Sequence, residues 1–329
     1  MRATPILIVS VLGIGGLIGF FGGHFLHNRS VHSLVMTREK DLVETHRGSF
    51  TNPLLACGDI DNLSVGSMEF LRTSVEAIIE ESTDLRGVSH VSVYVRDLNN
   101  GPWMGIEEKK FFFPASLLKV PLLMAAYKKE EEEPGFLDGA VRFEHALLET
   151  TQLFPPKEVL VQGESYTKRD LLRRTIVHSD NQAATLLGEQ IGFDKIIAVF
   201  KDFGIDEPKT GEDYRMRVRT YASFFRVLYN ASYISRSHSE EALSLLSTVA
   251  FTDALRAGVP DTIKVAHKFG EREGEVENGD IQLHDCGIVY AQSPYLICIM
   301  AQGKTTEGIL ATMIQISKEV YRTIGDSKQ

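Results

Sequence analysis

The chain has 329 residues, with 35 Lys and Arg against 44 Asp and Glu, which gives a net charge of -9 at pH 7. This length is enough to bury one large core or two modest ones, and a composition that is 43% hydrophobic and 24% charged excludes wholesale disorder and a polytopic membrane protein. Because no overall basic field attracts phosphate backbones, nucleic acid is not an expected partner.

The first feature along the chain is an apolar run near its beginning. Residues 6–26 carry no formal charge, and at about 1.5 Å per residue a helix of this length reaches roughly 31 Å, one hydrocarbon thickness. The run is longer than a signal-peptide core, and no small-residue cleavage site follows it. We therefore predict one uncleaved transmembrane anchor over residues 1–28, followed by a polar tether over residues 29–58.

Three glycines in this run recur every four residues, at Gly15, Gly19 and Gly23. This spacing places them on one face of a helix, where they allow close helix pairing. It favours a weak homodimer through the membrane segment.

The rest of the chain, residues 59–329, alternates between helical and strand periodicity. Apolar residues three and four apart predict a first helix. A strand and a short partner strand follow, joined by the turn Asn99–Gly101, and a mostly helical stretch comes next. Three apolar strands and a closing helix complete the chain. The predicted segments are helix 64–82, strands 90–98 and 102–106, a helical subdomain over about 116–250, strands 262–269, 281–290 and 294–302, and helix 306–324.

This order predicts an α/β protein of the α+β type. The two ends of the chain can build one five-stranded antiparallel sheet flanked by the N- and C-terminal helices, with the helical stretch as a separate layer. A cleft between the sheet and the helical subdomain is the expected place for a site.

The three cysteines form no C-x-x-C pair, so the sequence predicts neither a zinc site nor a disulfide framework. Cys298 lies in the apolar run YLICIM, where we expect it to be buried and inert. Our hypothesis for an oxidising compartment is a bridge between Cys57 and Cys286.

Common catalytic and cofactor motifs are absent from the sequence. It contains no G-x-S-x-G, H-E-x-x-H or dinucleotide-binding glycine pattern, and its ten histidines show no metal-like spacing. Gly303, Lys304 and Thr305 resemble the end of a phosphate loop, but Cys298 replaces the glycine that such a loop requires. We therefore predict no metal and no cofactor.

A serine and a lysine three residues apart occur twice, at Ser116 and Lys119 and again at Ser165 and Lys168. On a helix this spacing puts the hydroxyl and the amine on one face, where a desolvated amine can take the hydroxyl proton. The first pair opens a strongly apolar helix. The second lies among charges, where Thr167 reads as a helix cap, so we select Ser116 and Lys119.

Two further polar elements follow in order. Ser179, Asp180 and Asn181 lie inside HSDNQAA, and the strand VAHKFGE presents Lys268, Phe269 and Gly270. With FPASLLKVPL, these elements resemble the S-x-x-K, S-D-N and K-T-G motifs of penicillin-recognising serine enzymes, specifically class A β-lactamases. The resemblance spans roughly residues 60–325 and implies a β-lactamase/transpeptidase-like fold. A literal K-T-G at 209–211 is too close to Asn181 and cannot continue as a core strand.

The resemblance implies catalytic roles for three side chains. Ser116 would be the acylated nucleophile, Lys119 would take or relay its proton, and Ser179 would connect that lysine to the leaving nitrogen. Asp180 would be structural and tie down its loop.

Substrate-binding roles are implied for the remaining motif residues. Asn181 would hydrogen-bond the substrate's side-chain amide, and Lys268 would attract the substrate carboxylate, with Gly270 completing its motif. The backbone N–H groups of Ser116 and Glu271 would form the oxyanion hole.

Two departures from the family pattern bear on turnover and specificity. Phe269 stands where the K-T-G threonine would offer a hydroxyl to the substrate carboxylate. No E-x-x-L-N segment, which in class A β-lactamases carries the deacylating glutamate, lies between Asn181 and Lys268. Glu207 and Glu212 are the nearest candidates, and we expect both to be exposed loop carboxylates.

The function implied is a membrane-anchored serine hydrolase acylated by β-lactams, with its domain outside the cytoplasm and slow hydrolysis of the acyl-enzyme. The motifs do not separate this reading from a D-alanyl-D-alanine carboxypeptidase or penicillin-binding protein that acts on peptidoglycan. A non-catalytic β-lactam sensor is the alternative from another class.

Overall fold

The computed structural model describes residues 48–52, 65–99, 101–146, 152–208, 213–273 and 279–325. The predicted membrane segment 6–26, with its three glycines, and most of the predicted tether lie outside these residues. Among the helices that are described, none combines the length and the apolar character needed to cross a membrane.

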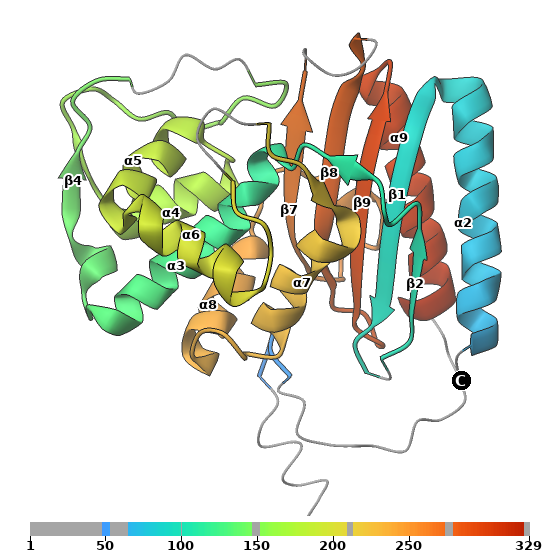
Figure 1. The fold of residues 1–329 in the computed structure, drawn as a ribbon, viewed down its shortest axis with the longest axis horizontal. Helices are drawn as coiled ribbons and strands as arrows, with labels where there is room; N and C mark the ends of the chain where they lie inside the picture. The colour runs from blue at the N-terminus through green and yellow to red at the C-terminus, as the bar shows by residue number, and fades with distance from the viewer. Residues whose placement is uncertain are drawn as a thin grey trace, which may run out of the picture. The chain divides into compact units, whose positions relative to one another are not determined.

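A five-stranded antiparallel sheet forms the centre of the body (Figure 1), with the strand order β2-β1-β9-β8-β7. The first two strands come from the N-terminal side of the chain and the other three from the C-terminal side, so the two ends meet between β1 and β9, and the predicted sheet is confirmed. The strands are β1 (Val88–Asp97), β2 (Trp103–Ile106), β7 (Val265–Arg272), β8 (Ile281–Val289) and β9 (Tyr295–Gly303).

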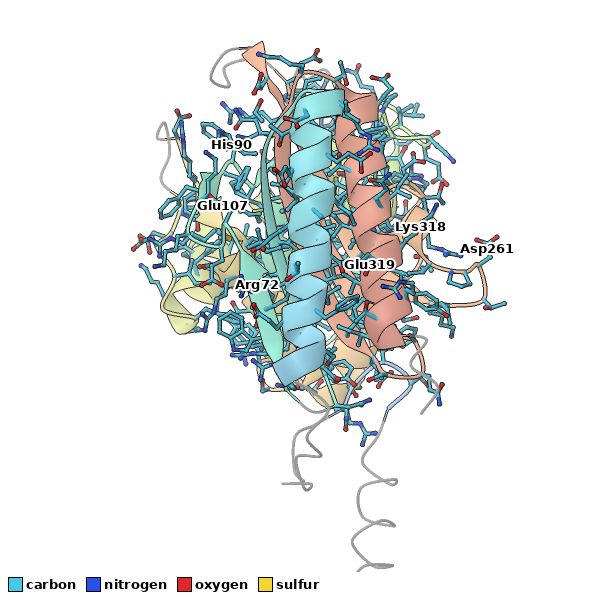
Figure 2. All side chains as sticks on the ribbon, turned by 90° about the vertical axis from the view of Figure 1, so that its right-hand side faces the viewer. Arg72, His90, Glu107, Asp261, Lys318 and Glu319 are labelled. Carbon is cyan, nitrogen blue, oxygen red and sulfur yellow. A yellow bond between two sulfur atoms is a disulfide. The ribbon has the colours of Figure 1, made fainter. Side chains whose placement is uncertain are left out.

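Two long helices cover one face of the sheet. They are α2 (Val65–Arg86) and α9 (Thr306–Val320), which Figure 2 shows side by side in front of the strands. The side chain of Arg72 on α2 donates to the Gly105 carbonyl on β2 at 2.6 Å, which ties the helix to the sheet edge. Thr305 caps the start of α9 by accepting from the Gly308 N–H. The predicted terminal helices are therefore confirmed.

The helical subdomain lies beside β7 at the other end of the sheet (Figure 1). Helix α7 lies in front of the sheet in Figure 1, where it contacts β1, β8 and β9, and it also packs against α8. Its α-helices are α3 (Lys119–Glu132), α4 (Lys168–Val177), α5 (Asn181–Ile191), α6 (Phe193–Asp202), α7 (Val218–Tyr229) and α8 (Arg236–Leu246). Short 3-10 turns flank them at η1 (Ala115–Leu118), η2 (Phe136–Asp138) and η3 (Arg256–Gly258), and a π-helical turn, η5 (Tyr321–Gly325), follows α9.

Two small two-stranded sheets join parts of this layer and were not predicted. They pair β3 (Phe111–Phe112) with β6 (Met216–Arg217), and β4 (Ala140–Arg142) with β5 (Ser165–Thr167). Strands of two or three residues carry too little alternation to be distinguished from loops in a sequence.

The cysteine hypothesis is wrong. Cys286 on β8 and Cys298 on β9 are direct cross-strand partners, with their Cα atoms 4.0 Å apart, and they form a disulfide. Cys286 therefore does not pair with Cys57, which lies outside the described residues. Cys298 is buried as expected, but it is bonded rather than inert. The error arises because the register between two neighbouring strands decides which cysteines meet.

A short part of the predicted tether packs on the body. The carboxylate of Glu240 on α8 accepts from the backbone N–H groups of Phe50 and Thr51, at 2.9 and 2.8 Å. The ring of Phe50 meets Tyr290 edge-on, with centroids 5.1 Å apart. Residues 49–52 are thus held against the body.

Candidate active site

Ser116 lies in η1, the turn that leads into α3. Ala115 in this turn adopts a left-handed φ of 48°. The turn is held in place by the buried hydroxyl of Tyr221, which donates to the Leu117 carbonyl at 3.0 Å. A left-handed alanine is sparsely populated and needs such support. Lys119 begins α3, and its Nζ donates to Ser116 Oγ at 2.9 Å.

Lys119 is the most highly connected side chain of the site. Besides Ser116, its Nζ lies 2.7 Å from the Ser179 carbonyl, 3.2 Å from Ser179 Oγ and 2.6 Å from Asn181 Oδ1. An ammonium has three donors, whereas four oxygens surround this nitrogen. The neutral amine has two donors and a lone pair, so it can accept the hydroxyl proton of Ser116.

Burial makes that neutral form accessible. Lys119 is 6% exposed, and desolvation lowers its pKa to about 7, against the opposing effect of the negative charges of Asp180 and Glu271. Near neutral pH the amine therefore exists in both forms.

Ser179 and Asp180 form the turn between α4 and α5. Ser179 has a left-handed φ of 54°, and Asp180 caps α5 by accepting from the backbone of Gln182 and Ala183 at 2.8 and 3.1 Å. Asp180 has a structural role at this turn, as the resemblance implied. The turn directs Ser179 Oγ towards both lysines of the site.

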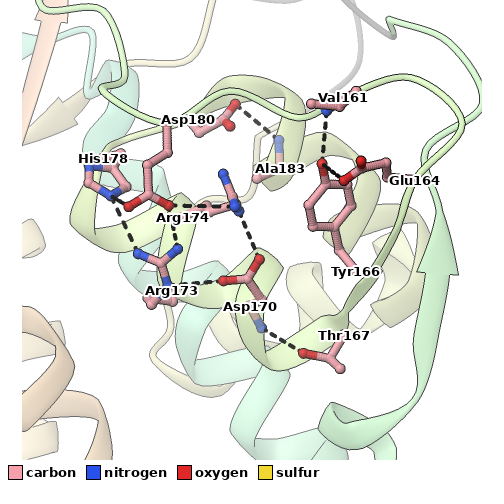
Figure 3. A network of polar contacts seen from close by, with 11 residues as sticks. Val161, Glu164, Tyr166, Thr167, Asp170, Arg173, Arg174, His178, Asp180 and Ala183 are labelled. Carbon is pink, nitrogen blue, oxygen red and sulfur yellow. Dashed lines mark hydrogen bonds and ion pairs between the residues drawn. The ribbon is translucent and has the colours of Figure 1, made fainter.

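A network of ion pairs holds the loop after residue 152 against α4 (Figure 3). Glu158 lies 2.6 Å from Arg173 and 3.3 Å from His178, and Asp170 bridges Arg173 and Arg174 at 2.9 and 2.8 Å. This anchoring fixes the loop beside the turn that carries Ser179.

The second Ser-x-x-Lys pair lies outside the site. Thr167 caps α4 by accepting from the Asp170 N–H at 3.1 Å, as predicted. Ser165 is on β5, and the Lys168 ammonium lies 4.1 Å from the ring centroid of Phe136.

Lys268 lies on β7, the edge strand of the sheet. Its side chain is 0% exposed, and its Nζ donates to Ser179 Oγ at 2.9 Å and to the Phe269 carbonyl at 2.8 Å. Burial and the nearby Lys119 charge lower its pKa well below the usual range. Lys268 thus orients the hydroxyl of Ser179 through this hydrogen bond.

Gly270 allows β7 to approach η1. A Cβ at this position would lie 2.7 Å from the Pro114 carbonyl oxygen and 3.0 Å from the Leu117 nitrogen, closer than side chains normally come. A glycine is therefore required where the strand passes the turn that carries Ser116.

Three phenylalanines form a cluster next to Lys268 that the sequence analysis did not predict. The Phe269 ring stacks on Phe251 with centroids 4.4 Å apart and meets Phe154 edge-on at 5.9 Å. The Lys268 ammonium lies 3.9 Å from the centroid of the Phe269 ring. Because two of the three rings come from loops, no periodicity marks them. We call Phe154, Phe251 and Phe269 the aromatic cover.

Glu271 extends from β7 to the loop that carries the aromatic cover. Its Oε1 accepts from the Phe154 N–H at 3.2 Å, and burial raises the pKa of its carboxyl group. The Glu271 side chain therefore lines the cavity beside Ser116. This is separate from the oxyanion-hole role implied for its backbone N–H.

The structure brings all the predicted site residues together. Four of them line one cavity of about 490 Å³, and Ser179 and Lys268 lie buried behind it, with Gly270 at the contact between β7 and η1. The four that line the cavity are Ser116, Lys119, Asn181 and Glu271.

Of the two candidate deacylating carboxylates, only Glu207 is among the described residues, and it is not part of this arrangement. Glu207 pairs with Lys201 at 3.3 Å and does not line the cavity, while Glu212 lies outside the described residues. In the part of the chain that the structure describes, no group of acidic, histidine or cysteine side chains is suited to a metal ion.

Comparison with known proteins identifies the family. A sequence model of the beta-lactamase enzyme family matches residues 71–324, which is most of the chain, so the protein belongs to this family. A search of curated proteins finds no match.

Solved structures show the same fold. A class A β-lactamase from Bacteroides cellulosilyticus has a TM-score of 0.67 and 17% identity, covering 78% of this chain and 98% of its own. A β-lactamase from Chitinophaga pinensis has a TM-score of 0.67 and 22% identity, covering 77% and 98%. PBP-A has a TM-score of 0.64 and 17% identity, covering 76% and 95%. The resemblance to class A β-lactamases and related penicillin-recognising enzymes is thereby confirmed.

Proposed function

We propose that this protein is a serine hydrolase that forms an acyl-enzyme at Ser116. The observation that carries the proposal is the 2.9 Å contact between Lys119 Nζ and Ser116 Oγ, together with a Lys119 pKa of about 7. A serine hydroxyl becomes a nucleophile when a neighbouring group can accept its proton at the working pH.

The first half-reaction follows from these contacts. Ser116 Oγ bonds to the substrate carbonyl carbon while its proton passes to Lys119. The carbon–nitrogen or carbon–oxygen bond to the leaving group then breaks, and the proton reaches that group through Ser179 Oγ, which lies 3.2 Å from Lys119 Nζ. In this proposal the backbone N–H groups of Ser116 and Glu271 stabilise the negative charge on the carbonyl oxygen.

β-Lactams are the proposed acylating compounds. Among the proteins of this fold, an L158E mutant of PBP-A, with 18% identity to this chain, is known as an acyl-enzyme complex with penicillin G. Asn181 lines the cavity beside Ser116, where its amide can bind the substrate's side-chain amide. Lys268 contributes by holding Ser179.

The second half-reaction is proposed to be slow. Of the described residues that line the cavity, Glu271 is the only carboxylate. Its Oε1 accepts from the Phe154 N–H and its buried Oε2 has no hydrogen-bond partner among the described residues, and in this proposal the carboxylate holds the loop at Phe154 and does not activate the deacylating water. Loss of a positioned general base typically costs about 10²–10⁴-fold in the step it serves. The acyl-enzyme should therefore persist.

The test is intact-mass measurement after mixing the full-length protein with benzylpenicillin. We expect the mass of one penicillin to be added to the wild type and to persist for minutes, and to be absent from Ser116→Ala. The matched control is Ser165→Ala, which removes the serine of the second Ser-x-x-Lys pair and should be labelled like the wild type. Labelling of Ser116→Ala, or none of the wild type by any β-lactam or activated ester, would refute the proposal.

The location is also a proposal. We propose that residues 1–28 anchor the protein in a bacterial membrane with the hydrolase domain on the outer side, where β-lactams and wall peptides are encountered. Protease added to cells whose outer membrane alone is permeabilised should then digest the domain, and full protection of the domain would contradict this placement.

A further inference from the structure

The cavity beside Ser116 is apolar along most of its length. It continues from the nucleophile between α3, α5 and α6, where its walls include Leu122, Ala184, Gly188, Ile196 and Phe200. Ala184 and Gly188 are four residues apart on α5, and Ile196 and Phe200 are four apart on α6, so each helix turns one apolar face to the cavity. A volume of about 490 Å³ is within the range of small-molecule sites.

Among the residues that the structure describes, the polar end of the cavity offers a substrate anion no unengaged cation. Lys119 is the only lysine or arginine of the described lining residues, and four oxygens already surround its Nζ. Lys268 is 0% exposed, with its ammonium 3.9 Å from the centroid of the Phe269 ring. Glu271 lines the same end and adds a carboxylate.

We infer that the site selects uncharged acyl donors whose acyl group is apolar and occupies the cavity between α3, α5 and α6. This inference rests on the proposed function of Ser116. It assigns the substrate class as neutral carboxylic esters or lactams. A free carboxylate near the reacting carbonyl would not make a substrate react faster. For an ester, Ser116 Oγ takes the acyl group and the alcohol leaves with the serine proton. Water then releases the carboxylic acid and restores the hydroxyl.

The first experiment compares benzylpenicillin with its methyl ester, two compounds that differ only in the carboxylate charge. The acylation rate constant of the full-length protein is measured by intact mass at pH 7.5. We expect the methyl ester to react at least as fast as the free acid. A free acid that reacts tenfold faster or more would overturn the inference while leaving Ser116 as the nucleophile.

The second experiment measures the cavity directly with 4-nitrophenyl esters from acetate to octanoate. Each methylene that enters an apolar cavity contributes roughly fourfold, so kcat/KM should rise by about a hundredfold or more from acetate to hexanoate in the wild type. Gly188→Leu should remove most of this rise. A Cβ at Gly188 would lie 3.7 Å from Ile196 Cδ1, an ordinary contact, so Gly188→Ala provides a milder variant that should shorten the preferred chain.

The matched control is Glu189→Leu, which adds the same side chain at the next position of α5, on an exposed residue. It should keep the wild-type chain-length profile. A flat profile in the wild type, or identical profiles for the Gly188 variants and the wild type, would overturn the inference. If no ester and no β-lactam acylates Ser116, the proposed function fails with it.

Discussion

The helical subdomain and the sheet enclose Ser116 from two sides, and these two halves of the site contribute different groups to it. The helical half provides the nucleophile, its base and an apolar cavity. In the sheet half, Lys268 is fully buried against the Phe269 ring of the aromatic cover, the cover lines a separate cavity of about 310 Å³, and Gly270 brings β7 into contact with η1. Both halves bury a lysine, but only the Lys119 ammonium lies against both Ser116 and the cavity.

This difference separates chemistry from support. A buried amine beside a hydroxyl and a cavity can exchange a proton with a substrate, whereas a buried amine sealed behind aromatic rings can only orient its neighbours. The helical half therefore determines the acylation rate and the range of substrates, and the sheet half determines the orientation of Ser179.

The largest effect is expected from Lys119. Lys119→Met should lower the acylation rate constant about 10²–10⁴-fold, because it removes the proton acceptor. Lys268→Met should cost roughly tenfold, the loss of one hydrogen bond to Ser179. Stopped-flow acylation by a chromogenic β-lactam measures both, with circular dichroism as the check on folding. Equal losses in the two variants would remove the distinction between the halves.

The pH dependence of acylation is the next largest effect. Because the pKa of Lys119 is about 7 and the neutral amine is the base, the acylation rate should fall about tenfold per pH unit below 7 and level off above it. Glu271→Gln removes a negative charge that raises the pKa of Lys119, so its profile should shift to lower pH. Rates of a neutral ester between pH 5 and 9 test this. A wild-type rate that stays constant down to pH 5 would exclude Lys119 as the base.

A smaller effect is expected from opening the sheet half. Phe269→Thr removes the ring next to the Lys268 ammonium, so a substrate carboxylate gains a path to that charge. We expect the preference for benzylpenicillin over its methyl ester to rise roughly tenfold, near the low end for a hydrogen bond to a charged group. Phe193→Thr, the same change in the wall of the cavity, should leave this ratio unchanged. An unchanged ratio in Phe269→Thr would show that the cover does not exclude anions.

The sequence was informative about regular elements and about chemistry in short motifs. Alternation predicted the first strand of the sheet, and apolar runs between turns predicted the three C-terminal strands. The three-residue spacing of Ser116 and Lys119 predicted that their side chains share one face, and they lie 2.9 Å apart. Both features are local, because a helix or strand fixes neighbours through its own period.

What the sequence could not predict depends on distant segments meeting. Phe154, Phe251 and Phe269 form the aromatic cover only after two loops and a strand pack together. The buried state of Lys268 follows from that packing, so its role in support was not evident from its motif. The cavity is likewise a space between three helices, which no single periodic pattern describes.

The smallest effect on acylation is expected from the disulfide in the sheet half. The bond joins Cys286 and Cys298, which the antiparallel register already holds opposite each other. The double variant Cys286→Ala/Cys298→Ala should lower the free energy of unfolding in urea by about 2–3 kcal/mol. Its acylation rate should remain within about twofold of the wild type, because neither residue lines the cavity.

Under denaturing, non-reducing conditions the wild type should titrate one thiol per chain, that of Cys57. Three thiols, or a peptide map that joins Cys57 to Cys286, would contradict the pairing, and a tenfold loss of acylation in the double variant would show that the sheet half also controls rate.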